Sequence, residues 1–177
     1  MKDTGDRTVV WEGRYIRAVT RGKWEFAERK NITGIVGMIP VTDRGHVVLV
    51  EQFRPALDAR VVELPAGLVG DIPGEEDEAL VTAAQRELIE ETGYRAASME
   101  RVFHGAASAG MCAEQITFFL ATGLEKVGPG GGDASEDITV HNVPLGDLLD
   151  WLDRRAAEGL VIDVKIYSAL YFCRGVS

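Results

Sequence analysis

The chain has 177 residues, of which 46% are hydrophobic and 27% charged, and its formal net charge is -9 at pH 7. This length suffices for one domain with a well-formed core, and the composition is that of a globular protein rather than of a disordered one. The negative charge argues against non-specific binding to nucleic acid or to an anionic membrane surface, because their phosphates would be repelled.

The sequence shows no pattern typical of a signal peptide or a membrane span. The first residues contain no apolar signal core, and no apolar run approaches the ~18 residues of a membrane span. The two cysteines, Cys112 and Cys173, are far apart and form no metal-binding or redox pair. We therefore expect a reduced, cytoplasmic protein with neither a membrane nor a nucleic acid as its partner.

The N-terminal half reads mainly as strands. Residues 8–33 predict short strands separated by turns, and residues 34–42 and 46–54 predict two longer strands joined by a tight turn. Residues 61–67 form a further extended run. Residues 68–78 are rich in Gly, Pro and acids, which is typical of a loop.

The C-terminal half mixes strands with helices. The apolar pattern predicts strands over 99–108, 115–127 and 138–145, a glycine-rich loop over 128–137, and helices over 145–159 and 161–172. Strands and helices that do not alternate regularly predict an α+β protein with helices packed on a sheet.

The first helix carries charge at its unfavourable end. Apolar residues recur at helical spacing up to Thr92, the acids at 75–78 suit the helix N-terminus, and Gly93 is a candidate left-handed cap. Glu87, Glu90 and Glu91 then share the last turns, where both the helix dipole and their mutual repulsion disfavour them. One interpretation is a solvated acidic face with Arg86 paired to Glu90. The other is a site for hard divalent cations, which prefer oxygen ligands.

The residues from Glu78 to Tyr94 resemble the Nudix box. The stretch is a glutamate, seven intervening residues and then RELIEETGY. The glycine of that pattern is best matched by Gly67, which implies a longer loop before Glu78. VVLVEQFR (47–54) and VVELPAG (61–67) are similar to the ADP-ribose and nucleoside-diphosphate-sugar pyrophosphatase branch of the family, and the similarity extends from about Val9 onward.

The resemblance implies a Nudix fold, which is an α/β/α sandwich with a mixed β-sheet and an N-terminal strand segment. It also implies two parts, a strand segment over 1–33 that makes dimer contacts and a Nudix hydrolase domain over 34–177. We therefore expect a homodimer with composite sites.

The resemblance further implies a site for Mg²⁺ or Mn²⁺. Glu87 and Glu91 would be direct ligands, Glu90 a ligand or a water-mediated contact, and the Ala66 carbonyl a further oxygen. The residues expected to support this site are Glu78, Arg86 and Gly93.

A base or late metal ligand is expected from the glycine-rich loop. Glu136 is the first candidate, with Asp133 and Asp137 behind it. The alternative is an ordinary acidic hairpin turn.

Five residues are candidates for contact with substrate. Arg54 ends a strand and suits phosphate oxygens, or is simply an exposed strand-end arginine. Glu63 would receive a ribose or base group, or pair with Arg54. Trp24 and Phe26 share a strand face and would stack on a nucleobase, or serve core or dimer packing. Glu114 would shape the pocket.

The expected reaction is metal-dependent hydrolysis of the diphosphate bond of a nucleoside diphosphate sugar, ADP-ribose or similar. The products would be a nucleoside monophosphate and a sugar phosphate. Two alternatives stay open, namely a nucleoside-triphosphate house-cleaning hydrolase and a non-catalytic sensor of nucleotide sugars. Ala109 stands where ADP-ribose pyrophosphatases commonly have proline, which leaves the sugar open.

Overall fold

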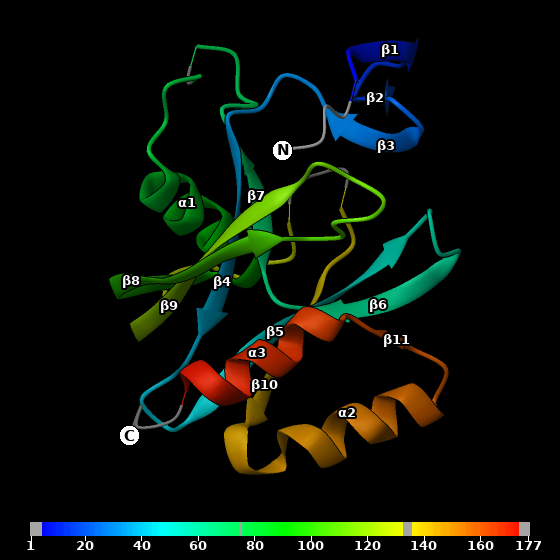
Figure 1. Cartoon of the computed structure of the whole chain (residues 1–177). Helices are drawn as coiled ribbons and strands as arrows, with labels where there is room; N and C mark the ends of the chain where they lie inside the picture. The colour runs from blue at the N-terminus through cyan, green and yellow to red at the C-terminus, as the bar shows by residue number, and fades with distance from the viewer. Residues whose placement is uncertain (1–4, 75, 133–135, 174–177) are drawn as a thin grey trace.

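Two four-stranded sheets form the centre of the protein in a computed structural model that describes residues 5–74, 76–132 and 136–173 (Figure 1). The first has the order β7-β4-β9-β8, with β7 Ala66–Val69, β4 Gly34–Pro40, β9 Gln115–Lys126 and β8 Tyr94–Ala106. The second has the order β10-β5-β6-β11, with β10 Thr139–Pro144, β5 His46–Arg54, β6 Ala59–Glu63 and β11 Val161–Ile162. Both sheets are mixed, since β4 pairs in parallel with β9 and β11 in parallel with β6.

The alternation of side chains along β4 separates two hydrophobic clusters. Val36 and Met38 face the cluster shared with the first helix, whereas Ile35 and Ile39 face the larger cluster shared with the second sheet and the C-terminal helices. This is the period-two pattern of a strand buried on both faces.

The helices cover opposite sides of these sheets (Figure 1). The helix α1 (Leu80–Thr92) packs on one side, and α2 (Leu148–Ala157) and α3 (Tyr167–Phe172) pack into the larger cluster on the other. The predicted α+β, α/β/α arrangement is therefore confirmed. None of the helices within the described ranges has the length and apolar character needed to cross a membrane.

The N-terminal strands make a separate antiparallel sheet. It consists of β1 (Arg7–Glu12), β2 (Ile16–Arg21) and β3 (Trp24–Arg29). Ala27 in β3 forms a parallel bridge with Cys112, so this sheet contacts the connection between β8 and β9. The division of the chain at residue 33 stays a prediction.

The start of α1 differs from the expectation. The helix begins at Leu80 after the cap residue Ala79 and has no acidic residue in its first turn, so the acids at 76–78 do not serve its N-terminus. Glu75 lies outside the described residues. The reason is a competing ion pair, because the Glu78 carboxylate accepts hydrogen bonds from Arg86, which lies within α1.

The last predicted helix is only partly correct. Residues 161–162 form the short strand β11, which pairs with Val61 and Val62 of β6, and the helical part is confined to a short 3₁₀ turn and α3. Asp163 separates the two pieces by accepting a hydrogen bond from the Lys165 amide at 2.8 Å, as a cap residue does.

The packing of α1 yields a first prediction. Leu88 is fully buried between the helix and the first sheet, whereas Val81 on the same helix is 44% exposed. Leu88→Ala should lower the free energy of unfolding by roughly 2–5 kcal/mol, since it leaves a cavity in the cluster. Urea denaturation in EDTA measures this, with Val81→Ala as the matched control. Equal losses for both variants would contradict the packing described here.

Candidate active site

A cavity of about 530 Å³ opens where α1, β7 and the end of β3 meet. Its wall is dominated by charge, with six carboxylates facing three guanidinium groups. The carboxylates belong to Asp71, Glu87, Glu90, Glu91, Glu114 and Glu136, and the guanidinium groups to Arg29, Arg54 and Arg86. Acidic groups thus outnumber basic groups two to one along the wall of this confined space.

The helix α1 presents its carboxylates to the cavity while its other face is held in the core. Glu87 and Glu91 are one turn apart, as their spacing predicts, and Leu88 anchors the buried face. Glu91 is only 3% exposed, and its Oε2 accepts a hydrogen bond from the Ala66 amide of β7 at 3.1 Å. The helix and β7 are thereby joined at the floor of the cavity.

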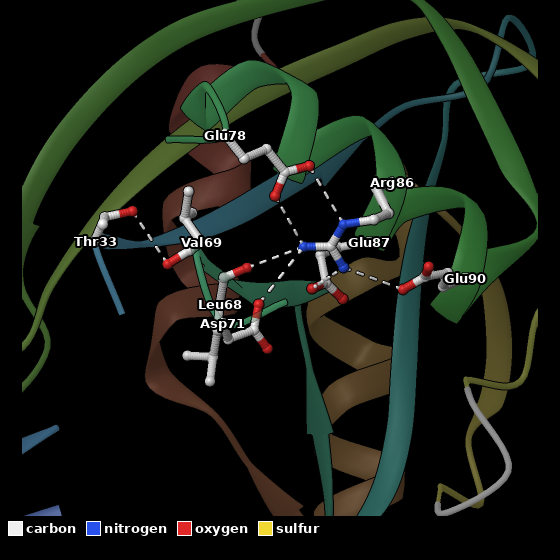
Figure 2. A network of polar contacts seen from close by, with 8 residues as sticks. All are labelled: Thr33, Leu68, Val69, Asp71, Glu78, Arg86, Glu87 and Glu90. Atoms are coloured by element: carbon white, nitrogen blue, oxygen red, sulfur yellow. Dashed lines mark hydrogen bonds and ion pairs between the residues drawn. The ribbon is translucent and has the colours of Figure 1, made fainter. Parts of the chain in front are cut away.

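Arg86 is the hub of the polar network in Figure 2. Its Nη1 lies 2.8 Å from Glu87 Oε1 and 3.3 Å from Glu90 Oε2, and its Nη2 lies 3.2 Å from both Glu78 Oε2 and the Leu68 carbonyl oxygen. The pairing of Arg86 with Glu90 that the sequence suggested is therefore present, but as one contact of several. Although burial disfavours its charge, hydrogen bonds to Glu78 and Glu87 raise the pKa of the Arg86 guanidinium.

Two of the carboxylates are costly to ionise. Burial raises the pKa of Glu87 to about 7, although the charge of Arg86 opposes the shift. Burial likewise raises the pKa of Glu91 to about 8, and the charges of Glu87 and Glu136 add to the effect. A cation bound among these groups would offset the desolvation of their charged forms.

The C-terminal end of α1 has the predicted glycine cap. Gly93 adopts a left-handed conformation, with φ of 71°, and donates its amide to the Ile89 carbonyl at 2.8 Å. The last turn contains no basic residue of its own. Lys126 of β9 supplies the charge instead, because its Nζ lies 2.7 Å from the Thr92 carbonyl oxygen.

Two arginines, each at the end of a strand, line the cavity, and each is held by a glutamate. Arg54 Nε lies 2.7 Å from Glu63 Oε2, which is the pairing that the sequence left as an alternative. Arg29 Nε lies 2.8 Å from Glu114 Oε1. Arg29 was not predicted from the sequence, since its partner is 85 residues away and no local pattern connects the two.

Trp24 and Phe26 line a neighbouring cavity of about 380 Å³ rather than the carboxylate-lined one. The two cavities approach each other where β3 meets the segment before β9. Glu28 and Ala113 line the cavity of Trp24 and Phe26, whereas the next residues along the chain, Arg29 and Glu114, line the carboxylate-lined cavity.

The candidate bases lie at the entrance to β10. Glu136 lines the carboxylate-lined cavity, and Asp137 pairs with Arg60 at 3.2 Å. Asp133 lies outside the described residues.

The carboxylates described here are not arranged around a common metal position. Among the residues that the structure describes, no group of three or more His, Cys, Asp and Glu side chains has a geometry that could hold a metal ion. Figure 2 shows that Glu87 and Glu90 are instead paired with the Arg86 guanidinium. A metal ion in this cavity would have to compete with that guanidinium.

Comparison with known proteins places this geometry in context. Residues 32–161 match the NUDIX domain family. The chain is 35% identical to the ADP-ribose pyrophosphatase of Bacillus subtilis (strain 168), over 97% of this chain and 94% of that protein. It is 34% identical to the methanol dehydrogenase activator of Bacillus methanolicus, of which it spans 64%, over 69% of this chain. A solved structure described as an ADP compounds hydrolase superposes with a TM-score of 0.66 at 21% identity, covering 96% of this chain and 90% of that one.

The raised pKa of Glu91 predicts how the metal-free protein responds to pH. In the unfolded chain this carboxyl ionises near its ordinary pKa, whereas in the folded protein it retains its proton up to about pH 8. The folded state thus binds the proton more tightly than the unfolded chain. The free energy of unfolding therefore falls as the pH rises from the ordinary pKa of 4.5 to the raised pKa of about 8. Glu91→Gln should remove part of that loss, by roughly 1–3 kcal/mol at pH 8.

Urea denaturation in EDTA at pH 5 and pH 8 measures this difference. The exposed residue Glu125 on β9 supplies the control, because Glu125→Gln should retain the wild-type pH response. A Glu91→Gln protein that loses as much stability as wild type between the two pH values would show that Glu91 is not the group responsible.

Proposed function

Because the chain belongs to the NUDIX domain family, we propose that it is a Nudix pyrophosphatase, which hydrolyses the diphosphate bond of a nucleoside diphosphate sugar such as ADP-ribose. The products are a nucleoside monophosphate and a sugar phosphate. The observation that carries the proposal is the charge pattern of the cavity, where six carboxylates face three arginines. A diphosphate alone would be repelled there, whereas a diphosphate with divalent cations would complement both kinds of group.

The donor set fits Mg²⁺ or Mn²⁺. The oxygen donors are the carboxylates of Glu87, Glu90 and Glu91, the Ala66 carbonyl and the carboxylate of Glu136, and hard divalent cations prefer such oxygens. The burial of Glu91 and the raised pKa values of Glu87 and Glu91 support the assignment, since burial makes the charged form of both carboxyls costly and a bound cation would offset that cost. Divalent cations bound here supply charge neutralisation on the diphosphate and activation of the attacking water.

Arg86 and Glu78 support these ligands. Arg86 contacts Glu87 and Glu90, and Glu78 holds the guanidinium in place. Arg86 would thus restrain two carboxylates that otherwise repel each other, in the manner of an outer partner that orients a ligand.

Arg29 and Arg54 bind and orient the diphosphate. A guanidinium fork pairs well with phosphate oxygens, and each arginine is preoriented by its glutamate, Glu114 or Glu63. Trp24 and Phe26 line the adjoining cavity and offer aromatic faces for a nucleobase, which would place the diphosphate over the carboxylates.

Glu136 accepts the proton of the attacking water. As the water oxygen bonds to phosphorus, the bridging P–O bond breaks and the leaving phosphate departs with its electron pair. The carboxylate lines the same cavity as Glu91, so it is on the correct side for this role.

We further propose a homodimer formed through the N-terminal sheet. Every residue of β1 is exposed, and large apolar side chains gather on this sheet and beside it. The most exposed of them are Val10, Trp11, Tyr15, Trp24 and Met111. Exposed apolar surface of this extent is typical of an interaction site. The free cysteines, Cys112 and Cys173, agree with a reducing, cytoplasmic location.

The activity is tested with a substrate panel. ADP-ribose, ADP-glucose, GDP-mannose, UDP-glucose and a deoxynucleoside triphosphate are incubated with Mg²⁺ or Mn²⁺, and the products are identified. Release of a nucleoside monophosphate and a sugar phosphate supports the proposal. Pyrophosphate from the triphosphate would favour the house-cleaning alternative, and nucleotide binding without turnover would favour the sensor.

The metal site predicts a sharp loss of turnover in Glu91→Gln. The variant should fold, yet its kcat should fall by ~10²-fold or more, because a ligand of the activating cations is lost. Steady-state kinetics at saturating Mg²⁺ measure the effect, with Glu125→Gln as the control of equal charge change. Near wild-type activity of Glu91→Gln would remove Glu91 from the metal site.

The dimer is tested in the full-length chain by the double change Trp11→Ser and Tyr15→Ser. Losing two exposed apolar side chains from the N-terminal sheet should shift the protein toward a monomer and raise the KM for substrate. Light scattering after size exclusion gives the mass. Leu149→Ser, which alters an exposed apolar residue on α2, is the control. An unchanged dimer would place the interface elsewhere.

A further inference from the structure

The glycine-rich segment before Glu136 lies directly on the C-terminal end of α1. The Gly131 amide donates to the Glu91 carbonyl at 2.9 Å, and the Gly132 amide donates to the Glu90 carbonyl at 3.0 Å. Val127 donates to the Gly93 carbonyl at 2.8 Å. The last carbonyls of a helix have no partner within the helix, so this segment satisfies groups that would otherwise need water.

Only glycine fits this contact. Gly130, Gly131 and Gly132 have φ values of 72°, 109° and 80°, a run of left-handed conformations that other residues rarely adopt. A Cβ on Gly130 would lie 2.5 Å from the Thr92 carbonyl carbon. The glycines thus allow the segment to approach the helix end closely, rather than merely lengthening a loop.

The same segment is bonded to the chain on the far side of Glu136. The Ile138 amide donates to the Gly131 carbonyl at 3.3 Å, so Gly131 is bound to α1 through its amide and to the entrance of β10 through its carbonyl. A Cβ on Gly132 would lie 2.4 Å from Glu136 Oε2, so that carboxylate rests against this glycine. Arg60 pairs with Asp137, the residue that follows Glu136.

We propose that Gly131 and Gly132 are positioning residues that fix the Glu136 carboxylate relative to the carboxylates of α1. Glu90 and Glu91 take part twice, since their side chains line the cavity and their carbonyls receive the glycine amides. A movement of the last turn of α1 is thereby transmitted to Glu136 through two hydrogen bonds. The inference rests on the proposed function, because it assigns Glu136 a role in that reaction.

A simple capping role would give a different result. If the glycine amides only completed the helix end, disturbing them would lower stability and impair all functions of the site in parallel. If they act through Glu136, disturbing them would lower kcat only while Glu136 can act. A double-mutant cycle separates the two cases, because residues that act as a unit are non-additive.

The closing experiment measures Gly131→Ala in the wild-type and Glu136→Gln backgrounds. Gly131→Ala should lower kcat by ~10-fold or more with little change in KM, since a small displacement of a reacting group is costly. In the Glu136→Gln background it should cause no further loss. Gly128→Ala is the control, because a Cβ there meets nothing within 4 Å. An equal loss of kcat in both backgrounds, or no loss in either, overturns the proposal.

A second measurement does not depend on activity. Amide hydrogen exchange followed by NMR should show Gly131 and Gly132 protected together with the last turn of α1, as amides bonded to helix carbonyls are. Exchange of these two amides at the rates of an unstructured peptide would refute the contact on which the proposal stands, even if Gly131→Ala failed to fold. A wild-type protein without turnover on any nucleotide overturns the proposed function alone, and exchange then still decides the contact.

Discussion

The arrangement of this protein depends on one electrostatic constraint, which is that six carboxylates share a small cavity with three arginines. In isolation the acidic residues of α1 oppose both the helix dipole and each other. The fold contains several compensations for that repulsion. Arg86 pairs with Glu87 and Glu90, Lys126 contacts the helix end, and Glu91 receives the Ala66 amide. The remaining imbalance is what a bound divalent cation would relieve.

These compensations come from elements far apart in the chain, so the site exists only when the sheets are assembled. The helix is anchored through Leu88 to the first sheet, β7 supplies the floor, and β9 supplies Lys126. The N-terminal sheet adds Arg29, which pairs with Glu114 from the segment before β9. Site geometry and core packing are therefore coupled, since the contacts that offset the acidic helix end come from elements held in place by the core.

The local features of the site could be predicted from the sequence, and its long-range pairings could not. The extent of α1 to Thr92, the cap at Gly93 and the shared face of Glu87 and Glu91 follow from spacing alone, because each involves neighbours within two helical turns. The pairing of Arg29 with Glu114 depends on residues brought together by tertiary structure, whereas the late start of α1 accompanies the ion pair between Glu78 and Arg86. The helix predicted over 161–172 was wrong at its start for a further reason. Val161 and Ile162 are β-branched residues that favour a strand, and parallel pairing with β6 stabilises that conformation.

Gly67 explains how the chain accommodates a longer loop without losing the site. A Cβ at this position would lie 2.0 Å from the Glu87 carboxylate carbon, so the side chain of Glu87 passes directly over the glycine on β7. The requirement is a close approach between a strand and a helix, and it does not fix the number of residues between them. The loop from Gly70 to Ala79 can therefore vary in length while both ends keep their places. The spacing of the glutamates within α1 is strict, because the helix sets their geometry. The spacing between Gly67 and Glu78 is relaxed, because the sheet fixes the position of Gly67 independently of the loop that follows.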